Sequence, residues 1–195
     1  RREHAVSRRG RSGEHPLKRL KTCLVVDVQE RLVPAIADHP RVVFNVRRLV
    51  DGAKALGLPV VATEQYPEGL GPTVPVLRER LGPVRSKLSF SCGPCADLFN
   101  PLGERGIHKI LVAGIEAHVC VEQTVLDLLN DGWRVYVAVD AAGSRHAVDR
   151  ETALRRMDSS GAVLTTTEAA LFEWCATAGA DEFKEISRLV REALP

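Results

Sequence analysis

The sequence predicts an α/β protein of three layers, with a mostly parallel sheet of about six strands between two layers of helices. From about residue 20 onward, short segments that are apolar throughout alternate with longer segments whose apolar residues recur at helical spacing. Strands that are apolar on both faces are typical of parallel sheets covered by helices on both sides. The 195 residues, 45% of them hydrophobic, are enough for one compact domain with a sizeable core.

The first expected strand spans 22–26, is rich in β-branched residues and stops at Asp27. Helical spacing of apolar residues predicts a helix at 41–56, which Gly57 ends. A second strand at 60–63 precedes a loop at 64–75, where glycine and proline cluster, and a short helix through residue 80. The remaining strands are expected at 84–90, 110–113, 134–139 and 162–165, and the remaining helices at 96–105, 119–130, 149–159, 168–175 and 182–193.

The net charge is only +2, but five arginines lie within the first eleven residues. We expect residues 1–18 to be a basic, flexible extension and residues 19–195 to be the folded domain. The charge gives no reason to expect a nucleic-acid partner, and no run approaches the roughly 20 apolar residues of a membrane span.

The five cysteines are odd in number and irregularly spaced, which favours free thiols in a reducing compartment, the cytoplasm by default. The arginine-rich start leaves organellar targeting open.

Several polar side chains come directly after the expected strands. Because parallel strands all end at the same edge of a sheet, these side chains gather at that edge, where ligands bind. They are Asp27, Glu64, Gln65, Lys87, Glu116, His118, Cys120, Asp140 and Ser144. Cys120 stands where an apolar strand stops and a helix starts, a position that favours the thiolate. A thiol that attacks a carbonyl needs a base to take its proton and a positive charge nearby. Asp27 and Lys87 supply these two groups.

At these residues the chain resembles the isochorismatase-like cysteine hydrolases, a family that includes nicotinamidases and N-carbamoylsarcosine amidohydrolase. The resemblance covers about residues 20–190. It depends on the segments Leu24-Val25-Val26-Asp27-Val28-Gln29, Arg85-Ser86-Lys87-Leu88-Ser89-Phe90 and Gly114-Ile115-Glu116-Ala117-His118-Val119-Cys120-Val121.

The resemblance implies a Rossmann-like architecture and a catalytic triad of Asp27, Lys87 and Cys120. It also implies a cis peptide between Ile115 and Glu116, an oxyanion hole formed by the backbone N–H groups of Glu116 and Cys120, and a homo-oligomer of two or more chains. The activity it implies is hydrolysis of a C–N bond, amide or carbamoyl, in a small-molecule substrate through a thioester. No cofactor is implied.

Two departures from the family narrow the activity. Nicotinamidases of the family bind a metal through an aspartate and two histidines after the second strand, whereas residues 63–73 contain no histidine, so no metal is expected. True isochorismatases hydrolyse a vinyl ether without a cysteine nucleophile, so Cys120 argues against that activity. The segment 64–73 is similar to the isochorismatase domain-containing subgroup. Two alternatives remain. One is a hydrolase that cleaves a vinyl ether without a covalent intermediate, and the other is a catalytically silent protein of the same fold that works in binding or assembly.

Four more residues are candidates for the pocket wall: Gln65, Tyr66, Phe90 and His118. His118 lies two positions from Cys120, and positions two apart on a helix point away from each other, so a direct pair is not expected.

Cys92-Gly93-Pro94-Cys95 has the spacing of a thioredoxin-like redox pair, but it comes after a weak strand in mid-chain rather than opening the first helix of such a fold. The context favours two unreactive thiols and leaves disulfide formation open.

Overall fold

The computed structural model describes residues 21–194, within which six strands form one sheet in the order β3-β2-β1-β4-β5-β6. Every neighbouring pair of these strands is parallel, which confirms the predicted fold class. The strands are β1 (Lys21–Val26), β2 (Val60–Gln65), β3 (Arg85–Lys87), β4 (Lys109–Ile115), β5 (Arg134–Gly143) and β6 (Val163–Thr165). The expected basic extension at 1–18 lies outside the described residues, and the domain boundary at residue 19 stays a prediction.

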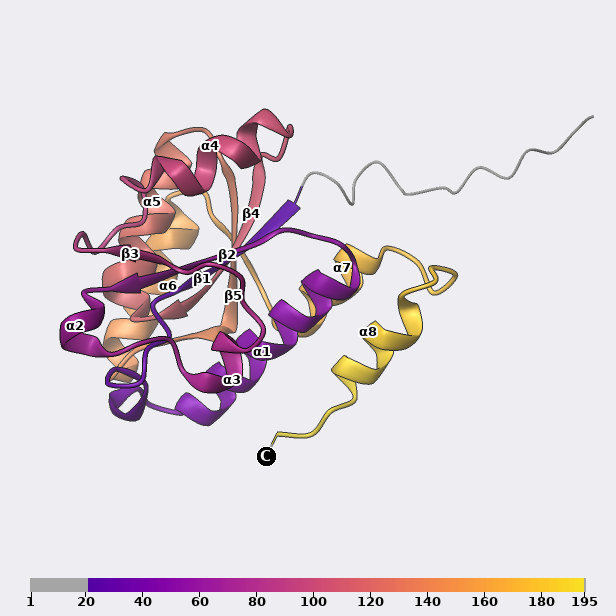
Figure 1. The fold of residues 1–195 in the computed structure, drawn as a ribbon, viewed down its shortest axis with the longest axis horizontal. Helices are drawn as coiled ribbons and strands as arrows, with labels where there is room; N and C mark the ends of the chain where they lie inside the picture. Colours follow the sequence, from indigo (N-terminus) through magenta and orange to yellow (C-terminus); the bar gives the residue numbers. More distant parts are fainter. Residues whose placement is uncertain (1–20, 195) are drawn as a thin grey trace, which may run out of the picture.

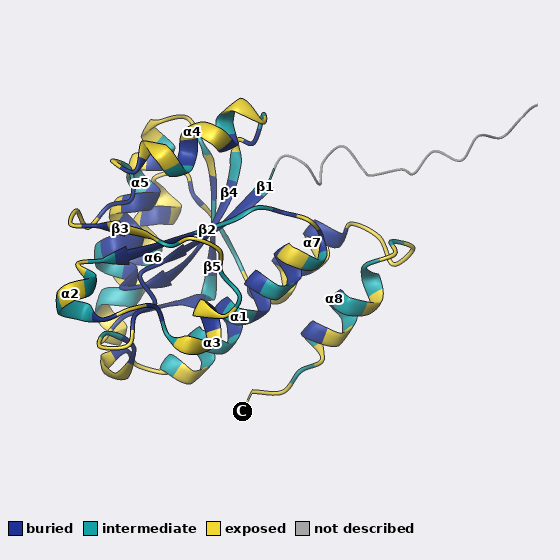
Figure 2. Cartoon of the chain, in the orientation of Figure 1, coloured by how far each residue is buried: buried dark blue, intermediate teal, exposed yellow. Residues whose placement is uncertain are grey.

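Helices cover both faces of the sheet (Figure 1). One face carries α1 (His39–Ala55), α7 (Thr167–Cys175) and α8 (Phe183–Val190), and the other carries α4 (Ala96–Glu104), α5 (Glu122–Asn130) and α6 (Ala147–Ser159). Along β1, Cys23 and Val25 enter the apolar core under α1, α7 and α8, while Leu24 and Val26 enter the core under α4, α5 and α6. Because this strand is buried on both faces, its sequence is apolar throughout rather than alternating, as Figure 2 shows for the centre of the sheet.

Several element boundaries differ from the predicted ones. The strand β2 extends to Gln65, so Glu64 and Gln65 belong to the strand and not to the loop after it. The strand β5 runs to Gly143 rather than to residue 139, because a register shift between Val112 and Gly114 of β4 lets the two strands pair again farther along. Asp140 therefore lies inside β5.

The connecting segments contain short helices that the sequence did not suggest. A 3-10 turn, η2 (Val33–Ala35), precedes α1, and α2 (Pro67–Leu70) lies inside the expected loop, whereas α3 (Pro75–Arg78) is the short helix that was expected after it. The helix expected from 119 begins as a π-helical turn, η3 (Ala117–Val121), which continues into α5. Strand β3 and helix α8 are shorter than predicted, whereas α6 starts two residues earlier, at Ala147. Among the described residues, no helix has both the length and the apolar character that crossing a membrane requires.

Gly114 lets β1 and β4 approach closely just before the ends of both strands. Its φ is +135°, and a Cβ at this position would lie 2.1 Å from the carbonyl oxygen of Val26. Any larger residue would clash with backbone, which cannot rotate away as a side chain can. Glycine is therefore required where the strands deliver Asp27 and the segment that leads to Cys120.

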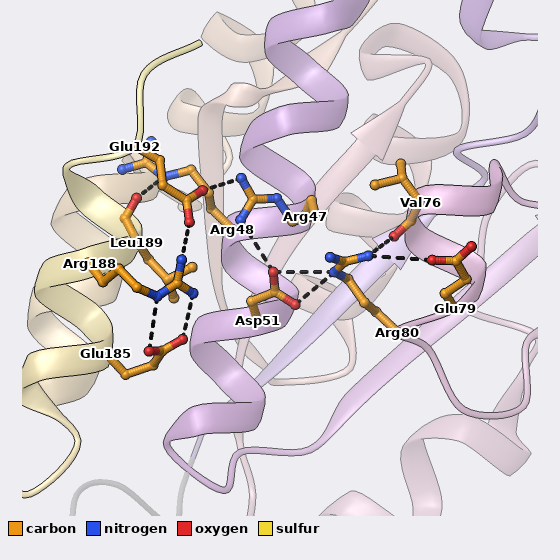
Figure 3. Close-up of polar contacts among 10 residues, drawn as sticks. All are labelled: Arg47, Arg48, Asp51, Val76, Glu79, Arg80, Glu185, Arg188, Leu189 and Glu192. Atoms are coloured by element: carbon orange, nitrogen blue, oxygen red, sulfur yellow. Dashed lines mark hydrogen bonds and ion pairs between the residues drawn. The ribbon is translucent and has the colours of Figure 1, made fainter. Parts of the chain in front are cut away.

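Helix α8 is anchored to α1 by apolar packing, and Figure 3 shows the ion pair and the hydrogen bond that also connect this end of the chain to α1. Ile186 and Leu189 of α8 are fully buried. Arg47 pairs with Glu192 just after the helix, and the buried Arg48 donates from Nε to the carbonyl oxygen of Leu189 at 2.8 Å. The C-terminal helix is thus part of the core on this face of the sheet.

Candidate active site

Asp27 is the first residue after β1, and its side chain is completely buried at the edge where the strands end. Its backbone adopts a left-handed conformation, with φ of 52°. Thr63 of β2 donates from Oγ1 to Oδ1 of Asp27 at 2.8 Å, and Lys87 donates from Nζ to Oδ2 at 2.6 Å. Both carboxylate oxygens are therefore engaged by neighbours from adjacent parts of the sheet.

Lys87 is the last residue of β3, two strands away from β1 in the sheet. Its side chain is 2% exposed and reaches the carboxylate of Asp27. The ammonium also donates to the carbonyl oxygens of Ser89, at 3.1 Å, and Phe90, at 2.8 Å. Its three donors thus meet three acceptors, which fixes the charge beside Asp27.

Cys120 lies in the η3 turn that comes after β4, and it is 5% exposed. The charges of Asp27 and Lys87 both act on its thiol, so the three side chains lie close together. The peptide between Ile115 and Glu116 is cis, at the position that the family resemblance implied. The carbonyl oxygen of Glu116 then accepts from the N–H groups of Val119 and Val121 as the turn begins. The structure thus brings Asp27, Lys87 and Cys120 together at one buried point.

The surroundings of the site raise the pKa of the base and of the nucleophile. Burial raises the pKa of Asp27, while the charge and hydrogen bond of Lys87 oppose this effect. Burial, together with the negative charge of Asp27, raises the pKa of the Cys120 thiol well above its ordinary value, and the Lys87 charge again opposes. In the resting site the proton therefore stays on sulfur, and the adjacent carboxylate is the group that can accept it.

Residues 21–169 match the model of the isochorismatase domain. The chain belongs to the isochorismatase family. It is 43% identical over 171 residues to isochorismatase domain-containing protein 2A of Mus musculus, a match that covers 87% of this chain and 82% of the mouse protein. This confirms the resemblance seen in the sequence.

Two solved structures have the same isochorismatase-family fold. The structure of MAR1 ribonuclease from Caenorhabditis elegans is 38% identical, with a TM-score of 0.86 over 91% of this chain and 93% of that chain. The YcaC gene product of Escherichia coli, described as an octameric hydrolase of unknown specificity, is 25% identical, with a TM-score of 0.79 over 89% of this chain and 93% of that chain.

Sequence reasoning missed three residues of this isochorismatase-family site. Thr63 fixes one oxygen of Asp27, and the sulfur of Cys92 lies 3.5 Å from the Thr63 hydroxyl. Thr124, on α5, donates to the carbonyl oxygen of Cys120 at 2.6 Å and accepts the N–H of Cys92 at 2.9 Å. A polar residue at the buried end of an apolar strand was the available signal for Thr63. The other two depend on contacts between distant segments.

Two of the expected pocket-wall residues organise the strand that carries Lys87. Gln65 donates from Nε2 to the carbonyl oxygen of Leu88 at 3.1 Å, and the N–H of Tyr66 donates to the carbonyl oxygen of Lys87 at 2.8 Å. The ring of Tyr66 is 48% exposed, and Phe90 is 53% exposed. Their place in the wall of the substrate pocket stays a prediction.

Glu116 and His118 connect the η3 turn to the end of β5. Arg145 donates from Nε to the carboxylate of Glu116 at 3.1 Å, and its backbone N–H lies 3.5 Å from the same group. His118 meets Ser144 across 3.0 Å, from Nδ1 to Oγ, so its ring contacts the end of β5 and not the thiol of Cys120. The side chain of Glu116 thus holds in place the backbone whose N–H the resemblance assigns to an oxyanion hole.

The other strand-end carboxylates stabilise loops and helix starts. Glu64 accepts from the N–H and the hydroxyl of Thr73, both at 2.7 Å. Asp140 accepts from the N–H of Thr167 at 2.8 Å, at the start of α7. Within residues 21–194, no three histidine, cysteine or acidic side chains gather in a way that could hold a metal ion.

Proposed function

We propose that this isochorismatase-family protein is a cysteine-dependent hydrolase that cleaves a C–N bond, amide or carbamoyl, in a small molecule. The observation that carries the proposal is the gathering of three groups at one buried point: Lys87 lies 2.6 Å from the carboxylate of Asp27, and the charges of both act on the thiol of Cys120. Acyl transfer through sulfur requires a nucleophile, a base and a cation in contact.

In the first half of the reaction, Asp27 takes the proton of Cys120 as the sulfur forms a bond to the substrate carbonyl carbon. The raised pKa values of both groups suit a transfer that accompanies the attack, because a free thiolate is disfavoured in the buried site. The N–H groups of Glu116 and Cys120 stabilise the oxyanion. The C–N bond then breaks, and Asp27 returns the proton to the leaving nitrogen.

In the second half, water attacks the thioester carbon and gives a proton to Asp27. The C–S bond breaks, the acid product leaves, and the sulfur of Cys120 recovers the proton. Lys87 keeps the carboxylate oriented through both halves, since its three hydrogen bonds leave it no other position. No cofactor takes part in this scheme.

The experiment that tests the proposal screens primary amides, ureas and carbamoyl compounds with the wild-type protein and the variant Cys120→Ala. We expect turnover by the wild type only, together with an acyl adduct that intact-mass spectrometry finds on Cys120. Cys175→Ala is the matched control, because Cys175 is an equally buried thiol in the core on the opposite face of the sheet.

Three results would overturn the proposal: turnover by Cys120→Ala, turnover of a vinyl ether without an adduct, or hydrolysis of single-stranded RNA by the wild type with no activity on amides. The RNA arm is included because a structural relative has the name of a ribonuclease. A vinyl-ether result would support the non-covalent alternative, and failure of every substrate would support a silent binding protein.

We also propose a homo-oligomer in the cytoplasm. The octameric description of the Escherichia coli relative supports assembly, and the five free cysteines support a reducing compartment. Size-exclusion chromatography with light scattering tests the first statement, and a monomer at micromolar concentration would contradict it.

A further inference from the structure

Cys92 and Cys95 lie at the two ends of a tight turn that leads into α4. The N–H of Cys95 donates to the carbonyl oxygen of Cys92 at 2.8 Å. A turn of this kind keeps its end Cα atoms within about 7 Å, close to the roughly 4.4–6.8 Å that a disulfide spans. Both side chains belong to the same apolar core.

Cys92 is connected to the base and to the nucleophile of the site. Its sulfur lies 3.5 Å from the hydroxyl of Thr63, which in turn donates to Asp27. Its N–H donates to Thr124, which donates to the carbonyl oxygen of Cys120. A rotation of the Cys92 side chain would change the contact with Thr63 and so the surroundings of Asp27, and a shift of its backbone would change the contact with Thr124 and so the surroundings of Cys120.

Cys95 borders a groove of about 480 Å³ that Arg85, Lys87 and Pro94 also line. A reagent that enters this groove meets Cys95, which is 4% exposed, before Cys92, which is fully buried. Burial raises the pKa of the Cys95 thiol; the charges of Arg85 and Lys87 oppose this effect, and those of Asp97 and Asp27 add to it. Burial raises the pKa of Cys92 to about 11. Cys95 is accordingly the thiol that reacts first.

We propose that Cys92 and Cys95 are a redox-active dithiol, which a small-molecule disulfide such as glutathione disulfide oxidises, and that the resulting disulfide switches off Cys120. The Cys95 sulfur loses its proton to solvent and attacks one glutathione sulfur, releasing the first glutathione. Cys92 then attacks the mixed disulfide and releases the second. Two thiols of the protein are oxidised, and one glutathione disulfide is reduced to two glutathione molecules.

The switch depends on where the sulfur of Cys92 must go. To bond Cys95 it has to leave Thr63, and the turn that also holds the N–H of Cys92 on Thr124 has to adjust. The pairing of the two thiols is independent of the hydrolase proposal, whereas the effect on Cys120 rests on it. Reduction restores the contacts of the present structure, in which all five cysteines are free.

The first measurement equilibrates the native protein with mixtures of reduced and oxidised glutathione and locates disulfides by peptide mass spectrometry. We expect a disulfide between Cys92 and Cys95 that dithiothreitol reverses. A bond between Cys92 and Cys120, or a glutathione adduct that stays on Cys95, would overturn the proposal. Cys95→Ser should abolish the bond, and Cys175→Ser, at a buried thiol on α7, should leave it unchanged.

The second measurement determines the rate at which iodoacetamide labels the peptide of Cys120. We expect the rate in the oxidised wild type to fall at least about tenfold, which corresponds to about 1.4 kcal/mol in the activation barrier. In the same oxidising mixture, the Cys95→Ser and Cys95→Ala variants should label Cys120 as fast as the wild-type protein does when its thiols are free. An unchanged rate in fully oxidised wild type would refute the switch, whether or not a hydrolytic substrate has been found.

Discussion

Replacing Lys87 with methionine tests the electrostatic basis of the site most directly. The substitution keeps most of the side-chain volume but removes an ammonium that is bonded to Asp27, Ser89 and Phe90. Asp27 would keep a completely buried carboxylate without its cation. Removing one partner of a buried ion pair costs about 3–5 kcal/mol of the free energy of unfolding. That is a large part of the roughly 5–15 kcal/mol typical of a folded protein.

The loss should depend on pH with a definite sign. Burial already raises the pKa of Asp27 in the native protein, and without Lys87 it would rise further. Between the unfolded value, about 3.9, and the folded value, the native state binds more protons than the unfolded state, so stability falls as pH rises through that window. The variant should therefore be closest to the wild type at acidic pH, where protonation removes the buried charge of Asp27, and farthest from it above the folded pKa.

Urea unfolding of the wild type and Lys87→Met at pH 4.5 and pH 8, monitored by circular dichroism, measures the effect. Lys54→Met is the matched control, because Lys54 is an exposed lysine at the end of α1 whose ammonium donates to the carbonyl oxygen of Arg80. A loss for Lys87→Met below about 1 kcal/mol at pH 8, no more than a surface pair is worth, would refute the reasoning. An equal loss at both pH values would show that charge is not the cause.

Three further predictions concern the close contact of β1 with β4, the docking of α8, and the nucleophile. Gly114→Ala should lower the free energy of unfolding by about 3 kcal/mol or more, because its Cβ would meet the Val26 carbonyl oxygen at a strained φ, and an unchanged thermal midpoint would contradict this. Ile186→Ala, at a fully buried site, should lower the free energy of unfolding in urea by about 2–5 kcal/mol. Arg188→Ala, at an exposed site on the same helix, should leave the urea midpoint unchanged, and an equal loss in the two variants would disprove that apolar packing holds α8 on α1. Alkylation of Cys120 should still accelerate with pH above 9, since its pKa is raised, and a plateau near the ordinary thiol pKa of about 8.5 would rule that out.

The order and type of the main elements could be predicted from sequence because each depends on neighbours along the chain. A continuous apolar run such as 110–113 has to be buried on both faces, and Gly57, which follows a run of helical spacing and has a positive φ, marks the end of that helix. The boundaries were less predictable where pairing with a distant strand decides them. The extension of β5 to Gly143 depends on its renewed contact with β4 beyond Gly114, which no local pattern records.

The candidate site divides in the same way. Asp27, Lys87 and Cys120 were selected because they come after strands, and the shared direction of parallel strands brings them to one edge. Thr63, Cys92 and the clamp of Arg145 on Glu116 were not selected, since each is defined only by what it touches. Their partners lie 36, 29 and 29 positions away along the chain.

The sequence by itself determined that this chain is a parallel α/β protein of the isochorismatase family with a thiol, a carboxylate and an ammonium at strand ends. Only the tertiary structure decided that the three gather at one point and that Lys87 and Asp27 touch, because strand order places β1 between β2 and β4 and leaves Lys87 to reach across from β3. It also decided that Cys92 lies against the Thr63 hydroxyl. Local sequence patterns indicate which residues are buried and where strands end. Contacts between side chains depend on how separate strands pack, and that packing is a property of the whole sheet.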